Sequence, residues 1–169
     1  MRFFDLPLIA KIRRNHGLEH ATIHILSEKH KRLSVVGRSD WNGFTLYGTI
    51  NTVDVQNAVE EALHRMRRGE SHLAVHPRCG TVLATTGFAT GLAAFLAIGI
   101  DSRTHDRFRW ATLPAAVLAA TGAAIVSQPL GLYLQERFTT SGYPANLEIK
   151  RIILQPNAKI VIHRVETVQ

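Results

Sequence analysis

The chain has 169 residues, of which 46% are hydrophobic and 20% charged, and it carries a net charge of +7 and one cysteine. This length accommodates one modest domain, or a small hydrophilic domain joined to a membrane element. The single cysteine excludes a disulfide bond within the chain. The basic residues are scattered and adjoin apolar segments instead of alternating with aromatic residues on one face, so the charge does not favour a nucleic-acid-binding protein.

The N-terminal segment, residues 3–14, mixes large apolar side chains with lysine and arginine. One interpretation is an amphipathic helix that lies on an anionic membrane surface. The other is the first turns of a longer helix that continues to about Glu28. If a separate helix begins after this segment, Asn15 is the expected N-cap, because its side-chain oxygen can accept a hydrogen bond from the first turn.

The next stretch, His16–His20, reads H-x-x-E-H. Positions i, i+3 and i+4 of a helix lie on one face, so His16, Glu19 and His20 would point the same way. Two imidazoles one turn apart can bind one divalent metal ion, and a neighbouring carboxylate can act on a water molecule beside it. The alternative is an ordinary helix face, because the pattern fixes only three positions and the chain has nine histidines.

A β-hairpin and a helix follow. Two short apolar stretches, Leu33–Val36 and Phe44–Tyr47, are separated by a connection that contains the turn dipeptide Asn42-Gly43. The helix opens at Thr52 and is closed by Gly69, with one apolar stripe and arginines in its last turn, where cations suit the helix dipole.

A second informative stretch is His76–Thr81, with the sequence HPRCGT. His76 and Cys79 are separated by two residues, and Pro77 and Gly80 favour the turn that would bring both side chains to one ion. The alternative is a polar linker with a buried, inert cysteine.

Two long uncharged segments come next, Gly80–Ile100 with 21 residues and Trp110–Gln135 with 26 residues. A helix needs about 20 residues to cross a hydrocarbon core, so these segments predict a transmembrane hairpin. The alternative, two buried helices of a soluble bundle, is disfavoured because neither segment has a polar face. Small residues such as Gly87 and Gly91 would let the spans pack on each other or on copies of themselves.

The distribution of basic residues predicts the orientation of this hairpin. Seventeen of the twenty lysines and arginines lie in residues 1–79 and 136–169, on the side that holds both termini, and three lie in the 101–109 connection. The positive-inside rule therefore places both termini in the cytoplasm.

The tail predicts a second β-hairpin, Leu147–Leu154 and Lys159–Arg164, around a turn at Gln155–Ala158. Together the two hairpins could form one four-stranded antiparallel sheet with helices on one face.

The expected fold class is thus α+β, a small antiparallel sheet with covering helices and an inserted two-helix transmembrane hairpin. Residues 1–79 would be a cytoplasmic part that carries the site, residues 80–135 the membrane hairpin, and residues 136–169 the cytoplasmic hairpin that completes the sheet.

The two motifs together, His16–His20 and HPRCGT directly before a membrane span, resemble the paired signatures of the YqhQ-like membrane proteins, which are described as metal-dependent enzymes of unknown substrate. The chain is also similar to bacterial membrane proteins of unknown function with the same order of motif, helix and hairpin. The resemblance covers residues 15 to 100 and implies a bacterial inner (plasma) membrane protein. It also implies that five residues belong to one site: His16, Glu19, His20, His76 and Cys79.

The leading hypothesis is a membrane-anchored zinc enzyme, most simply a hydrolase, with its site at the cytoplasmic membrane surface. His16 and His20 would bind the metal with Cys79 or His76 as the third ligand, because a mixed Cys/His set favours zinc over calcium or magnesium. Glu19 would act as the general base. A lipid headgroup or a segment of a membrane protein is the expected substrate.

Three other hypotheses stay open. A structural zinc site closed by both motifs would pin the first helix to the membrane span. Alternatively, Cys79 could be a thiolate nucleophile with His76 or His72 as its base. Finally, the protein could be a small scaffold or accessory subunit that contacts membrane lipids, a membrane-protein partner or a second copy of itself.

Overall fold

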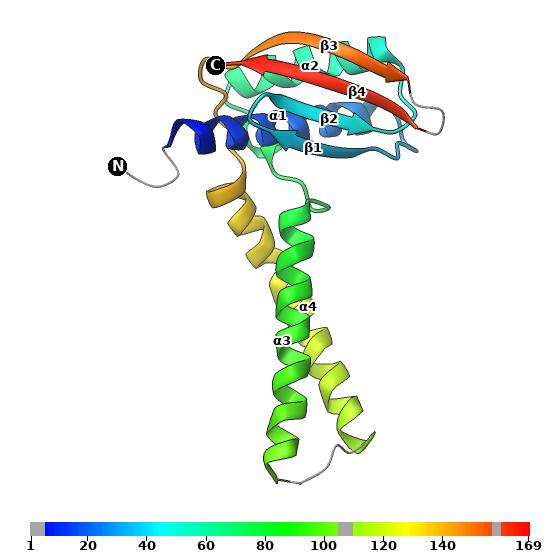
Figure 1. Cartoon of the computed structure of the whole chain (residues 1–169), viewed down its shortest axis with the longest axis vertical. Helices are drawn as coiled ribbons and strands as arrows, with labels where there is room; N and C mark the ends of the chain where they lie inside the picture. Colours follow the sequence, from blue (N-terminus) through cyan, green and yellow to red (C-terminus); the bar gives the residue numbers. More distant parts are fainter. Residues whose placement is uncertain (1–5, 105–109, 157–159) are drawn as a thin grey trace. The chain divides into compact units, whose positions relative to one another are not determined.

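The computed structural model describes residues 6–104, 110–156 and 160–169 (Figure 1). The chain divides into two compact units, a hydrophilic unit of Met1–His76 with Glu136–Gln169 and an apolar unit of Pro77–Gln135. The elements follow one another as α1 (Pro7–Lys29), β1 (Val36–Asp40), β2 (Gly43–Tyr47), α2 (Thr52–Arg67), the 3₁₀ turn η2 (Ser71–Ala74), α3 (Gly80–Thr104), the short turn η3 (Trp110–Thr112), α4 (Leu113–Leu134), the π-helical turn η4 (Gln135–Thr139), β3 (Glu148–Pro156) and β4 (Val161–Val168).

The α+β fold class is confirmed. The hydrophilic unit contains one four-stranded antiparallel sheet in the order β1-β2-β4-β3, so the C-terminal hairpin continues the sheet of the N-terminal hairpin (Figure 1). Phe44 and Leu46 of β2 and Val165 of β4 alternate with more exposed neighbours, and they are buried in one core with α1 and α2. The strands therefore show the period-2 pattern of a sheet with one covered face.

An ion pair also joins the two hairpins. Both guanidinium Nη atoms of Arg164 on β4 donate to the carboxylate of Asp40 on β1, at 2.8 Å each. Burial alone would raise the pKa of Asp40, but the hydrogen bonds from Arg164 lower it below its ordinary value. This bidentate contact reaches across β2 and links β1 to β4, in agreement with the strand order given by the backbone pairing.

The first helix is a single long helix, so no separate helix begins at Asn15. Helix α1 is continuous from Pro7 to Lys29, so Asn15 lies inside it and not at an N-cap. The Asn15 side chain is fully buried and donates to the carbonyl of Asp40 at 2.8 Å, and its oxygen accepts from Thr167 Oγ1 at 2.7 Å. Asn15 therefore joins the helix to two strands of the sheet, β1 through Asp40 and β4 through Thr167. The start of the predicted amphipathic segment, residues 3–5, lies outside the described residues.

The first hairpin begins later than predicted. Strand β1 is Val36–Asp40 and shares only Val36 with the predicted strand Leu33–Val36, because the turn consists of Trp41 and Asn42 and Asp40 already pairs with Gly43. Gly43 has a φ of +138°, which disfavours any other residue there. The tail hairpin is confirmed, although residues 157 and 158 of its predicted turn and residue 159 of its predicted second strand lie outside the described residues.

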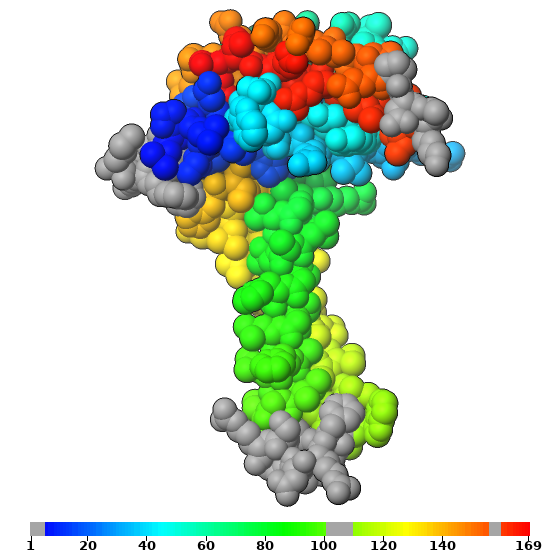
Figure 2. Space-filling view, viewed as in Figure 1, coloured from blue at the N-terminus to red at the C-terminus, as the bar shows by residue number. Residues whose placement is uncertain are grey.

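The apolar unit contains two helices that are long and apolar enough to cross a membrane, within Gly80–Ile100 and Trp110–Thr139. Helices α3 and α4 pack on each other (Figure 2). Large apolar side chains remain exposed along both helices. Their close approach is at Gly131, where an added Cβ would lie 2.9 Å from the Cα of Val82, and at a hydrogen bond of 3.1 Å from Ser127 to Thr86. At Gly87 and Gly91 an added Cβ would meet no described atom within 4 Å, so these two glycines do not mediate the contact.

The segment after α4 returns to α1 within the hydrophilic unit. Arg13 Nη2 donates to the carbonyls of Arg137 and Thr140, at 2.9 and 3.0 Å, and the N–H of Ser141 donates to the carbonyl of Arg13 at 2.9 Å. Gly17 makes this docking possible, because a Cβ there would overlap the carbonyl oxygen of Ser141.

We therefore expect Gly17→Ala to destabilise the protein by about 1–3 kcal/mol, the usual cost of overpacking. This cost of overpacking exceeds the roughly 1 kcal/mol by which alanine stabilises a helix relative to glycine. The matched control is Gly91→Ala in α3, where the added methyl group meets open space. Thermal unfolding in detergent measures both, and a Gly17→Ala protein at least as stable as the wild type would contradict the docking.

A second buried polar group is His163 on β4, which is fully buried. Its Nε2 lies 3.0 Å from Thr52 Oγ1 at the start of α2, and its Nδ1 has no hydrogen-bond partner among the described residues. Burial lowers the pKa of His163 below the ordinary histidine value, so the folded protein holds this ring in the neutral form.

The unfolded chain therefore takes up a proton at His163 near pH 6.5, where the folded chain does not. The contribution of His163 to the free energy of unfolding is therefore fully present above this pH. It falls as the pH drops, by at most about 1.4 kcal/mol per pH unit for one proton. We expect His163→Gln to flatten the dependence of the unfolding midpoint on pH between 6.5 and 5, relative to the wild type. Parallel pH profiles of the two proteins would refute this assignment.

Candidate metal centre

Four histidines gather in the hydrophilic unit. His16, His20 and His24 lie one turn apart on α1, and His76 follows η2. The ring centroids of His16 and His20 are 4.4 Å apart, those of His20 and His76 5.9 Å, and those of His24 and His76 5.3 Å. His20 is 3% exposed and the other three are half-buried. The structure thus brings together three of the predicted site residues and adds His24.

The chain fixes which nitrogen of His16 and His20 carries the proton. His16 Nδ1 lies 2.9 Å from the carbonyl oxygen of Thr139, and His20 Nδ1 lies 2.8 Å from that of Ala74. A carbonyl oxygen only accepts, so in the neutral ring the proton sits on Nδ1 and Nε2 keeps its lone pair. Metal-binding histidines typically have this arrangement, in which a second hydrogen bond fixes the tautomer and the orientation of the ring.

His24 has the opposite tautomer. Its Nε2 lies 2.9 Å from the carbonyl oxygen of Val75, so Nδ1 keeps the lone pair in the neutral ring. Sequence reasoning missed this residue, although its spacing of four from His20 and eight from His16 continues the same helical stripe.

Glu19 is 4% exposed, and its carboxyl group lies against Gly37 on strand β1, where an added Cβ would overlap Oε1. The two histidines bond to carbonyls of η2 and η4, outside the sheet, whereas the carboxylate turns towards the sheet. The role of Glu19 as general base stays a prediction.

Cys79 follows His76 by three residues and directly precedes α3. Its side chain is buried, and the N–H of Thr81 donates to Sγ at 3.4 Å. The N-terminal end of a helix favours negative charge, which suits the thiolate form that binds metals. His72, the other candidate of this region, is exposed in η2.

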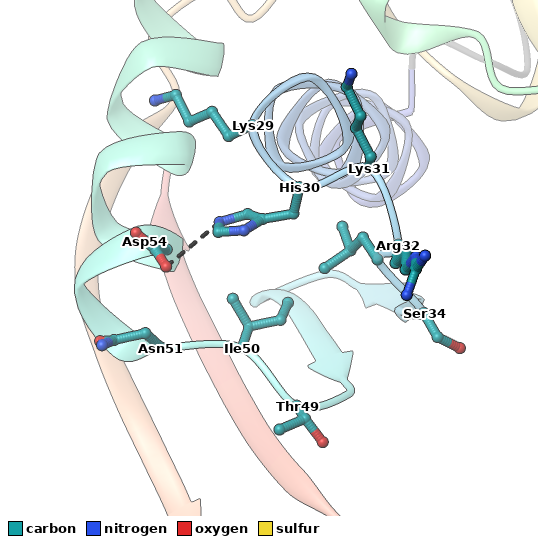
Figure 3. Close-up of a pocket in the computed structure, with 10 residues that line it drawn as sticks. Lys29, His30, Lys31, Arg32, Ser34, Thr49, Ile50, Asn51 and Asp54 are labelled. Atoms are coloured by element: carbon teal, nitrogen blue, oxygen red, sulfur yellow. Dashed lines mark ion pairs between the residues drawn. The ribbon is translucent and has the colours of Figure 1, made fainter.

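A pocket of about 660 Å³ lies elsewhere on the hydrophilic unit, between the end of α1 and the start of α2 (Figure 3). In Figure 3 the ring of His30 points towards Asp54, and the two groups are 3.4 Å apart. Lys29 pairs with Glu61 at 2.8 Å. None of the four clustered histidines lines this pocket, so it is separate from the candidate metal centre.

Comparisons with known proteins give a family but no activity. The profile of the family described as "Domain of unknown function (DUF6391)" matches residues 11–152. An uncharacterized protein of Picosynechococcus sp. (strain PCC 7002) is 36% identical over an alignment of 155 residues, and the match covers 83% of this chain and 71% of that protein. No solved structure matches the chain.

The match includes His16–His20 and HPRCGT, both apolar helices and the first part of strand β3. The resemblance to the YqhQ-like proteins is not confirmed by these comparisons, whereas the expected similarity to bacterial proteins of unknown function agrees with the cyanobacterial relative. The chain belongs to the DUF6391 family.

Proposed function

We propose that the protein is a membrane-associated zinc enzyme, a hydrolase, whose metal is held by His16, His20 and Cys79. The observation that carries the proposal is the pair of hydrogen bonds from Nδ1 of His16 and His20 to backbone carbonyls. Both rings are thereby held with an Nε2 lone pair available to one ion, one helical turn apart.

Cys79 is the favoured third ligand because chain connectivity limits its distance from the histidines. Three residues of extended chain span about 11 Å, so Cys79 cannot lie far from His76, whose ring is next to His20. A set of one thiolate and two imidazoles suits zinc, and three protein ligands would leave a fourth position open. His76 is the alternative third ligand.

A zinc ion in such a site would supply Lewis acidity for hydrolysis. Carbonyl hydrogen bonds would keep the histidines neutral and oriented. Glu19 would have to reach the site from its position against Gly37 to act as a base. As expected from the sequence, we propose a substrate at the membrane surface, a lipid headgroup or a segment of a membrane protein.

A second candidate function is a non-catalytic scaffold or accessory subunit with a structural zinc site. The packing of the Glu19 carboxyl group against β1 and the near-complete burial of His20 favour it. In this case His76 would join the other three ligands and close the site.

For the location, we propose the bacterial inner membrane, with both termini in the cytoplasm. The two apolar helices support membrane association, and the excess of lysine and arginine in the parts that hold the termini supports the orientation.

Elemental analysis of the detergent-purified protein tests the metal. We expect about one zinc per chain in the wild type. His20→Ala and Cys79→Ser should each weaken zinc binding by at least about 100-fold, since losing a ligand exceeds the 10- to 100-fold effect of losing a supporting hydrogen bond. His64→Ala, an exposed histidine on α2, is the matched control and should keep its zinc. Folded His20→Ala protein with undiminished zinc would overturn the proposal, and circular dichroism checks the fold.

Glu19→Gln separates the two candidate functions. The substitution keeps the shape of the side chain that packs on Gly37, so zinc content should stay at the wild-type level in both cases. A hydrolase that uses Glu19 loses its function in a cell in which the variant replaces the native protein. A structural site predicts an unchanged phenotype, which would contradict the enzyme.

A further inference from the structure

A second pocket of the hydrophilic unit, about 500 Å³ in volume, contains a cluster of arginines. It lies between the end of α2, the η2 region and the segment that follows α4. Its charged lining residues are three arginines and one glutamate, and hydroxyl groups surround them. We call it the arginine pocket; it is lined by Arg13, Arg67, Arg68, Glu136 and several serine, threonine and tyrosine residues.

Two of these arginines are held in place by backbone carbonyls. Arg67 Nη2 donates to the carbonyl of Leu147 at 2.9 Å. Arg13 Nη2 donates to the carbonyls of Arg137 and Thr140. A guanidinium group has five N–H donors in a fixed planar fork, so the bond to Leu147 orients the Arg67 side chain with only one of its donors.

Two arginines of this pocket differ from arginines elsewhere in the hydrophilic unit that pair with carboxylates. Arg65 pairs with Glu28 and Glu70, and Arg151 pairs with Glu166. In the described part of the chain, neither Arg67 nor Arg68 has a carboxylate partner within salt-bridge distance. The end of α2 favours cations at these positions, but its partial negative charge of about one half does not balance two full charges. The pocket therefore has an excess of positive charge.

The walls of the pocket are packed closely. Gly142 lies against Ser71, where an added Cβ would come within 2.9 Å of the Ser71 Cα, and the hydroxyl of Ser141 donates to the carbonyl of Tyr143 at 3.0 Å. Arginines that backbone carbonyls hold in place suit a tetrahedral oxyanion, because one guanidinium group can donate to two phosphate oxygens at once. We propose that the arginine pocket binds a phosphate-bearing ligand.

The pocket shares its walls with the histidine cluster. Ala74 and Val75 line it, and their carbonyls accept the hydrogen bonds of His20 and His24. Thr140 lines it as well and directly follows Thr139, whose carbonyl orients His16. A bound phosphate would thus contact the backbone segments that orient the proposed metal ligands. The binding itself goes beyond the proposed function and needs no metal.

Phosphate binding to the full-length protein in detergent is the test, measured by ³¹P NMR titration with a chelator present to remove any metal. The probes are inorganic phosphate, glycerol phosphate and a short-chain phosphatidic acid. Arg68→Gln should weaken binding by about tenfold or more, because the substitution removes one charge-assisted hydrogen bond to the phosphate. Arg32→Gln is the matched control, because it removes an exposed arginine from the other pocket, and it should change the affinity less than about twofold.

Saturable binding that Arg68→Gln weakens and Arg32→Gln leaves intact supports the proposal. Within that result, binding of the two water-soluble probes identifies a free phosphate or phosphomonoester, and binding of phosphatidic acid alone identifies a lipid headgroup. Absence of saturable binding by all three probes overturns the proposal, and so does equal weakening by both substitutions. Because the chelator removes metal, failure of the zinc proposal leaves this result unchanged.

Discussion

Two hydrogen bonds, from the Nδ1 atoms of His16 and His20 to the carbonyl oxygens of Thr139 and Ala74, define the candidate centre. They fix a tautomer as well as a position, since a carbonyl can only accept. Without them, the two rings would be half of a short sequence pattern on a helix. With them, both rings keep an Nε2 lone pair, and this is the property that a metal site requires.

The fold explains why these acceptors are available. Thr139 is 123 residues from His16 along the chain and belongs to the segment that follows the second apolar helix. That segment docks on α1 because Gly17 has no side chain to prevent it, and the strands that follow complete the sheet that α1 covers. Gly17 lies inside the H-x-x-E-H motif, so one short stretch supplies both the histidines and the surface that holds their hydrogen-bond partner.

The sequence predicted the elements with strong periodicity or uniform composition, namely both hairpins, α2 and the two apolar helices. It predicted the first strand at Leu33–Val36, which shares only Val36 with β1, because turn geometry and not apolar composition sets the register. It could not decide between one helix and two around Asn15, since only the distant partners of this residue, Asp40 and Thr167, explain a buried amide within a helix. For the same reason it predicted the spacing of His16 and His20 but not their carbonyl partners, and it did not predict the position of Glu19 against the sheet.

Nitrogen-15 NMR of histidine-labelled protein tests the assignment of the tautomers most directly, because long-range proton–nitrogen correlations distinguish a protonated ring nitrogen from one with a lone pair. In metal-free protein above pH 7, we expect a protonated Nδ1 and an unprotonated Nε2 for both His16 and His20, and added zinc should shift the Nε2 resonances of both. Substitution of each histidine assigns its signals. Rings protonated on Nε2, or Nε2 resonances that do not respond to zinc, would contradict the proposed metal centre.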